Sequence, residues 1–154
     1  MEKIKLLNGW SNRKETLPPA DPVRLYLAWP DSGPPPALSA SPPALTAFPD
    51  ATALRLYLTA DLFSRLAQRT GRRVQLVDRP EAAQLVVASE PSRGRSGLWL
   101  KVAAPVSTGD LTGFSLDEIR LYFYSNAPYS SSLKIGPDTL AGRRAAFSRL
   151  KDYV

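Results

Sequence analysis

Residues 50–77 form one long patterned stretch, in which the apolar residues before Gly71 follow a helical period. They recur at intervals of three and four positions, which predicts an amphipathic helix. Asp50 or Thr52 can cap this helix by accepting a hydrogen bond from a free backbone N–H, and Gly71 can end it in a left-handed conformation. The predicted apolar stripe consists of Leu54, Tyr57, Leu58, Leu62 and Leu66, while Arg55, Arg65, Gln68 and Arg69 are expected to point elsewhere.

Short apolar segments predict β-strands before and after the helix. The first is residues 23–29, and residues 74–77 form a β-rich run directly after Gly71. Residues 83–89 are expected to form a fully buried strand and residues 98–103 a fourth strand. Because a helix followed directly by a strand is half of a βαβ crossover, the pattern predicts an α/β protein with a parallel sheet. One face of the first strand is expected to consist of Val23, Leu25, Leu27 and Trp29.

The segments around the first strand have a different character. Residues 3–7 alternate charged and apolar positions and predict a short edge strand, and residues 12–15 form a polar stretch. Residues 29–49 are rich in proline and predict an extended crossover loop. We favour this interpretation over a proline-rich ligand for a small adaptor domain. The expected anchors of the loop are Leu38, Leu45 and Phe48.

The last third of the chain is predicted to be helical. Ser115 and Glu118 form a capping box, and Pro137 suits the first position of a final helix. The buried stripe of the earlier helix is expected to consist of Leu116, Ile119, Tyr122 and Phe123. The final helix is expected to turn Leu140, Phe147, Leu150 and Val154 inward and Arg143, Arg144, Arg149 and Lys151 outward.

Composition excludes several classes of site. The 154 residues contain neither cysteine nor histidine, so a disulfide framework, a Cys/His zinc site, a thiol nucleophile and an imidazole base are all impossible. The acidic residues show no ligand-like spacing, and we expect no metal. No apolar run approaches the roughly 20 residues that a membrane span needs. Since the N-terminal apolar patch is too short for a secretory signal, we expect a cytoplasmic protein. The length of 154 residues predicts a single domain.

Charge adds a hypothesis about partners. The net charge of +6 and the isoelectric point of about 9.8 favour polyanions, nucleic acid first. A compositional drift toward arginine in a GC-rich genome would give the same charge. Glycines and arginines in residues 91–97 could cradle a phosphate, but a true phosphate loop also needs spaced glycines and a lysine, so a surface turn is favoured. The candidate RNA-binding residues are Arg69, Arg72, Arg73, Arg143 and Arg144.

Three segments together share the pattern of one known family. The first, LLNGWSNRKETLPPADPVRLYLAWP, combines a leucine-rich start, a basic and acidic stretch, prolines and a strand. The second is the helical RLYLTAD at residues 55–61, and the third is residues 111–150, which include FSLDEIRLYFYSNAPYSSSLKIGPDTL. They resemble segments of the cysteinyl-tRNA synthetases, a group of class I aminoacyl-tRNA synthetases. The resemblance covers most of the chain in two blocks, with a much shorter middle.

This resemblance implies a fold and a division of the chain. It implies a small Rossmann-like (HUP-type) parallel sheet of about four strands with flanking helices. Residues 1–110 would form a truncated Rossmann-like domain of the nucleotidyl-transferase type. Residues 111–154 would form a helical segment, like the region that contacts the tRNA acceptor stem in the family, packed on that domain.

Departures from the family pattern imply that catalysis is lost. The strand that carries the family's zinc-binding cysteine ends here in Ala28, Trp29 and Pro30. The HIGH-type nucleotide motif aligns with residues 50–53, which keep neither histidine nor glycine. The KMSKS-type phosphate loop falls near residues 97–101, where one lysine survives. The resemblance therefore implies no zinc, and it leaves ATP as a ligand whose binding motifs are lost.

These losses predict a non-catalytic binding or assembly module whose partner is a protein or tRNA. Removing the middle strands is expected to uncover a sheet edge, which favours a homo-oligomer or a protein partner. The second hypothesis is an RNA-binding module. The third is a residual aminoacyl-tRNA ligase, or another ATP-dependent amino-acid-activating enzyme, that uses Lys101 and Asp61. We expect no membrane partner.

Overall fold

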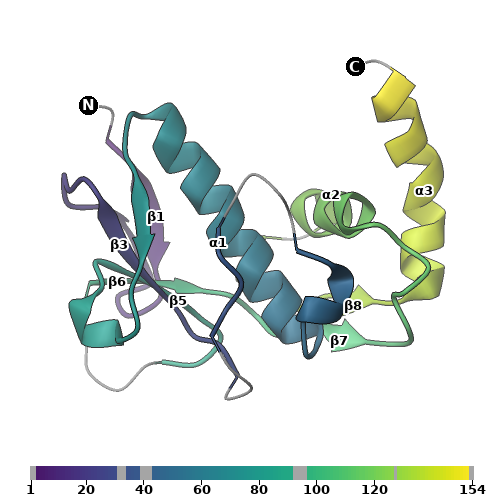
Figure 1. Cartoon of the computed structure of the whole chain (residues 1–154), viewed down its shortest axis with the longest axis horizontal. Helices are drawn as coiled ribbons and strands as arrows, with labels where there is room; N and C mark the ends of the chain where they lie inside the picture. Colours follow the sequence, from purple (N-terminus) through teal and green to yellow (C-terminus); the bar gives the residue numbers. More distant parts are fainter. Residues whose placement is uncertain (1–2, 31–33, 39–42, 92–96, 127, 153–154) are drawn as a thin grey trace.

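A computed structural model of the chain describes residues 3–30, 34–38, 43–91, 97–126 and 128–152. Strands and helices are interspersed along the chain, and the N-terminal strands and the C-terminal helix lie on opposite sides of the long central helix in Figure 1. In chain order the elements are β1 (Lys5–Asn8), β2 (Arg13–Thr16), β3 (Val23–Leu27), the 3₁₀ turn η1 (Leu45–Ala47), α1 (Ala51–Arg69), β4 (Val74–Leu76), the 3₁₀ turn η2 (Pro80–Ala82), β5 (Leu85–Ala88), β6 (Leu98–Lys101), β7 (Val106–Ser107), α2 (Leu116–Asn126), β8 (Lys134–Ile135) and α3 (Pro137–Asp152).

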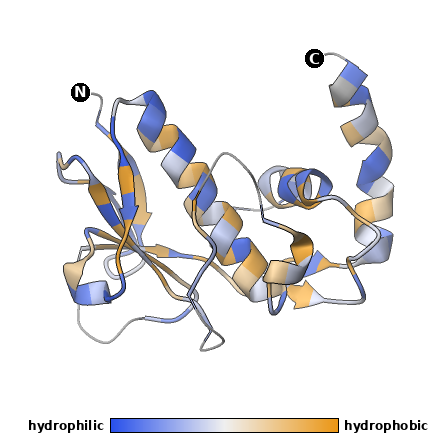
Figure 2. Cartoon of the chain, in the orientation of Figure 1, coloured by the Kyte–Doolittle hydropathy of each residue, from blue (hydrophilic) through white to orange (hydrophobic). Residues whose placement is uncertain are grey.

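The prediction of an α/β protein with a parallel sheet of about four strands is confirmed. Strands β4, β3, β5 and β6 form one sheet in that order, and every neighbouring pair is parallel. The chain passes from the central strand β3 through α1 to β4, which is the βαβ crossover that the sequence indicates. Strand residues are mostly hydrophobic, whereas α3 carries strongly hydrophilic positions (Figure 2).

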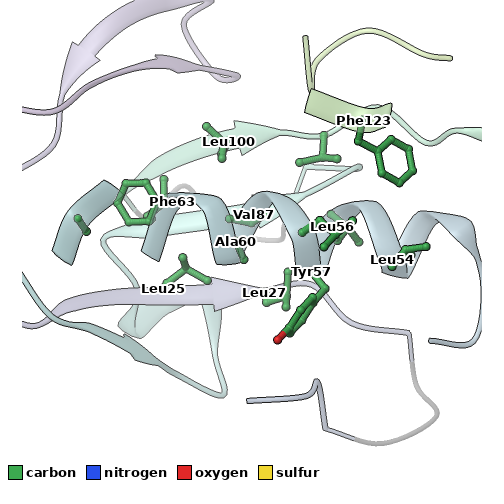
Figure 3. Packing of buried hydrophobic residues seen from close by; sticks show 14 of the residues in the cluster. Leu25, Leu27, Leu54, Leu56, Tyr57, Ala60, Phe63, Val87, Leu100 and Phe123 are labelled. Atoms are coloured by element: carbon green, nitrogen blue, oxygen red, sulfur yellow. The ribbon is translucent and has the colours of Figure 1, made fainter. Parts of the chain in front are cut away.

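Helix α1 is the central element of the core, and its buried face differs from the predicted stripe. Leu56, Ala60 and Phe63 lie in one apolar cluster with strand residues such as Leu25, Val87 and Leu100 (Figure 3). The prediction was wrong for Leu66, whose side chain is 49% exposed, and for Arg55, which is 2% exposed. The reason is that α1 packs against the sheet on one side and against the C-terminal segment on the other. One stripe cannot describe a helix that is buried on nearly every side.

The ends of α1 are as expected. The carboxylate of Asp50 accepts a hydrogen bond from the backbone N–H of Ala53 at 2.8 Å, and Gly71 follows the helix with a φ of +80°. The proline-rich crossover loop is held by its predicted anchors, since the side chains of Leu38, Leu45 and Phe48 are half-buried against the core.

The two edges of the sheet differ. Strands β1 and β2 form an antiparallel hairpin, although residues 12–15 were expected to be only a polar stretch. The hairpin lies against β6: the N–H of Gly9 donates to the carbonyl of Trp99 at 2.7 Å, and the side-chain oxygen of Asn8 accepts from the N–H of Trp99 at 3.1 Å. Within the described residues, the edge that no strand covers is therefore that of β4, which is only three residues long.

The C-terminal segment starts as predicted and ends differently. Ser115 and Glu118 form the capping box of α2, and Pro137 opens α3. Leu140 is buried, but Leu150 is 52% exposed, so the predicted inner face of α3 was wrong at that position; Val154 lies outside the described residues. Figure 1 shows why: beyond its first turns, α3 extends away from the sheet and α1.

Candidate functional site

A cavity of about 490 Å³ lies beside the first turn of α1. Helix α1 runs antiparallel to the strands, so its first turn is at the carboxyl end of the sheet, where open α/β sheets usually bind ligands. We call this space the α1 cavity. One wall comes from the end of the crossover loop and the start of α1, and the other from the loop between β7 and α2. Its lining residues are Leu45, Thr46, Phe48, Pro49, Asp50, Ala51, Leu54, Ser107, Gly109, Asp110, Leu111, Thr112 and Phe114.

Two carboxylates line the α1 cavity, and local sequence explains the position of each. Asp50 is the N-cap of α1, so its side chain turns toward the free N–H groups of the first turn. Asp110 forms an Asx-type turn in which its carboxylate accepts from the backbone N–H of Thr112 at 3.0 Å and from the Thr112 hydroxyl at 2.9 Å. These bonds, the backbone one first, lower the pKa of Asp110. The carboxylate of Asp110 is therefore ionised at neutral pH.

Most of the remaining lining is apolar. Phe48 packs against Tyr57 with their ring centroids 5.2 Å apart, and against Trp29 at 6.1 Å. On the opposite wall, Phe114 lies under the guanidinium of Arg144, which is 4.6 Å from the ring centroid. No lysine or arginine is among the lining residues that the structure describes. The cavity therefore combines apolar walls, a few hydroxyl groups and negative charge.

The positions that align with the lost nucleotide motifs fall in two separate places. Asp50 and Ala51 line the α1 cavity, whereas Lys101 lines a second cavity of about 360 Å³ with Leu7, Gly9, Asn12, Tyr129 and Ser130. The ammonium of Lys101 is 5.8 Å from the centre of the Trp99 ring. The structure therefore does not bring Lys101 and Asp50 together in one cavity.

The suggested phosphate cradle falls largely outside the described residues, because residues 92–96 are not among them. Gly97, at its end, has a structural reason for being glycine. Its φ is +65°, and a Cβ at this position would lie 2.4 Å from the carbonyl oxygen of Gln84. Its conformation and its close approach to β5 explain Gly97 without an anion.

Asp61, the other polar group considered for catalysis, faces a neighbouring helix. It is 4% exposed and forms ion pairs with Arg65 on α1, at 2.9 Å, and with Arg120 on α2, at 3.4 Å. The carboxylate of Asp61 therefore links α1 to α2, and Asp61 lines none of the described cavities.

The candidate RNA-binding arginines form two groups rather than one surface. Arg69, Arg72 and Arg73 lie at the C-terminal end of α1, and Arg143 and Arg144 lie on α3, at the other end of the molecule in Figure 1. Arg72 is 3% exposed and donates to the carbonyl of Pro18, and Arg73 pairs with Asp21 at 3.2 Å.

The α3 arginines also have protein partners. Arg143 donates to the side-chain oxygen of Asn126, and Arg144 pairs with Glu118 at 3.0 Å and donates to the carbonyl of Gly113. The exposed members of the predicted set are Arg69, Arg73, Arg143 and Arg144. Arg72 is therefore the one member of that set that burial withdraws from a polyanion.

Sequence reasoning missed the structural role of Arg55. Its guanidinium donates to the carbonyls of Ala103 and Ser131, both at 2.8 Å, and of Pro128 at 3.0 Å, and it lies 5.5 Å from the centre of the Phe123 ring. Burial lowers the pKa of Arg55 from its ordinary value. The signal in the sequence was one arginine between Leu54 and Leu56, inside an apolar run. A long side chain there must find acceptors at some distance from its own helix.

The described residues contain no group of acidic side chains that could hold a metal ion, and none of their helices is long and apolar enough to cross a membrane. Compared with models of protein families, with curated proteins and with solved structures, the chain matches none. The resemblance to cysteinyl-tRNA synthetases therefore remains a prediction from the sequence.

Proposed function

We propose that this protein is a non-catalytic binding module on a small Rossmann-like scaffold, similar to a shortened cysteinyl-tRNA synthetase. The observation that supports the proposal is the charge of the α1 cavity. Helix N-termini in such scaffolds bind phosphates through free N–H groups and the helix dipole. Here Asp50 accepts from the N–H of Ala53, and Asp110 adds a second negative charge to the same cavity. A triphosphate would meet repulsion where a nucleotide-activating enzyme supplies donors.

ATP-dependent activation of amino acids tests this proposal directly. We expect no ATP–pyrophosphate exchange with any of the twenty amino acids, and no saturable ATP binding by calorimetry. A matched variant, Asp50→Ser with Asp110→Asn, retains the capping oxygen of α1 and the acceptor of the Asx-type turn and removes both charges. It shows whether the carboxylates alone exclude the nucleotide. Clear exchange by the unchanged protein would favour the alternative, a residual amino-acid-activating enzyme, and would overturn the proposal.

The partner of such a module would be a protein bound at the β4 edge or a tRNA bound at α3. The short edge of β4 can add a strand from a second chain, and α3, which extends away from the sheet in Figure 1, carries the exposed Arg143, Arg144 and Arg149. The two partners differ in their expected dependence on salt. Strand addition depends on backbone hydrogen bonds, whereas phosphate contacts weaken steeply as salt rises.

Sedimentation at rising salt, with and without tRNA, distinguishes these partners. Self-association through β4 would persist at high salt, and complex formation with tRNA would be lost. The informative variant is Arg143→Glu with Arg149→Glu, because reversing Arg144 would also break its ion pair with Glu118. Lys3→Glu with Lys5→Glu, two exposed lysines outside the candidate set, changes the charge equally and is the matched control. A monomer at micromolar concentration that ignores tRNA at low salt would remove both partners from the proposal.

A further inference from the structure

We infer that the α1 cavity binds small organic ammonium ions that carry an apolar body about the size of an aromatic ring. This inference rests on the proposed function, because it assigns a ligand class to the same cavity from which ATP is excluded. It starts from the cavity itself, whose volume of about 490 Å³ is in the range of ordinary small-molecule sites.

The polar part of the lining selects the charge of the ligand. Every formal charge among the described lining residues is negative, and the two carboxylates come from opposite walls. One oxygen of Asp50 accepts from Ala53, and its other oxygen has no hydrogen bond to a described residue. Each oxygen of Asp110 accepts one bond from Thr112 and has capacity for a second. An ammonium group has three donors and no acceptor, so it matches acceptors of this kind.

The apolar part of the lining selects the body of the ligand. Phe48 and Leu45 come from the end of the crossover loop, and Leu111 and Phe114 come from the loop before α2. An aliphatic or aromatic group between these side chains would remove apolar surface from water on both walls. Arg144, a cation that lies over the lining residue Phe114, is paired with Glu118 at 3.0 Å, so its charge is compensated locally. A simple metal cation would leave these apolar walls uncovered.

Three probes of similar shape and different charge test the inference. They are 2-phenylethylamine, 2-phenylethanol and 3-phenylpropionate, titrated into the full chain near pH 7 and followed by heteronuclear NMR. We expect the amine to shift signals of the cavity residues and to bind about five- to tenfold more tightly than the alcohol, since ion pairs with partly exposed carboxylates contribute modestly. The carboxylate should not saturate. Equal binding of all three probes, or shifts that lie away from the cavity, would overturn the inference.

Isosteric variants connect any preference to the two carboxylates. Asp50→Asn retains the helix cap and Asp110→Asn retains the turn acceptor, so neither should change the melting temperature greatly. Each should reduce the preference for the amine about two- to threefold. Asp138→Asn, in the first turn of α3 and outside the lining, is the matched control. If these variants bind the amine as tightly as the unchanged protein, the carboxylates do not select the ligand and the inference is wrong.

ATP as a competitor separates this inference from the proposed function. If ATP displaces the amine from the cavity, the exclusion of nucleotides fails together with the proposed function. If neither ATP nor the amine binds, the proposed function stands and the inference of an ammonium ligand fails.

Discussion

Replacing Arg55 by alanine is expected to lower the free energy of unfolding by about 3 kcal/mol. The guanidinium donates to the backbone carbonyls of Ala103, Pro128 and Ser131, of which that of Pro128 also accepts from the N–H of Ser131 at 2.9 Å. Its loss leaves the carbonyls of Ala103 and Ser131 without a donor among the described residues and opens a space beside Phe123, over which the guanidinium lies. Urea unfolding followed by circular dichroism measures the loss.

Two further variants separate the hydrogen bonds of Arg55 from its packing. Arg55→Met retains an unbranched chain of similar volume but has no donor, so it should remain about 2 kcal/mol less stable than the unchanged protein. Arg69→Ala, on the exposed end of the same helix, should cost less than about 1 kcal/mol. A methionine variant as stable as the unchanged protein would show that the three hydrogen bonds contribute nothing net.

Replacing Gly97 by alanine is the second change with a large expected effect, again about 3 kcal/mol of destabilisation. Gly97 has a φ of +65°, which an L-residue adopts at a cost, and its added Cβ would lie 2.4 Å from the carbonyl oxygen of Gln84. That carbonyl accepts the hydrogen bond from Leu98 at the start of β6, so it cannot move without disturbing the pairing of β5 with β6. Thermal and urea unfolding would measure the loss.

Gly71 provides the matched control for Gly97. It also has a positive φ, of +80°, but no atom lies within 4 Å of the position of an added Cβ. Gly71→Ala should therefore show the conformational cost alone, about 1 kcal/mol. The difference in destabilisation between Gly97→Ala and Gly71→Ala measures the cost of the contact between the added Cβ and the carbonyl of Gln84. Equal losses would mean that the contact with Gln84 relaxes freely.

Both positions explain features that sequence motifs would assign to function. Gly97 lies at the end of a segment that could be taken as a phosphate-binding loop. Its positive φ and its closeness to the carbonyl of Gln84 explain why this position is glycine. Arg55 lies in the helix that resembles the first long helix of a tRNA synthetase, and its bonds are to the protein's own backbone. Function is therefore better sought at the α1 cavity, where polar groups face open space.

Local patterns in the sequence were sufficient for the class of fold, the strands of the parallel sheet and the three helices, but not for the short strands β2, β7 and β8. Asp50 and Gly71 delimit α1 because capping and left-handed termination depend on residues within one turn. The run Leu85–Ala88 is buried throughout, as a continuous apolar strand inside a parallel sheet must be. Ser115 and Glu118 mark the start of α2 for the same local reason. Each of these features depends on residues a few positions apart.

Only the tertiary structure decided which faces are buried and which polar groups meet. The burial of Arg55, the exposure of Leu66 and Leu150, and the covered edge of β6 all depend on segments far away in the chain. The α1 cavity likewise brings Asp50 and Asp110 together from two loops that are 60 residues apart in sequence. Periodicity reports that a face is apolar, but it does not report how many neighbours will pack around a helix, because those neighbours are placed by the fold as a whole.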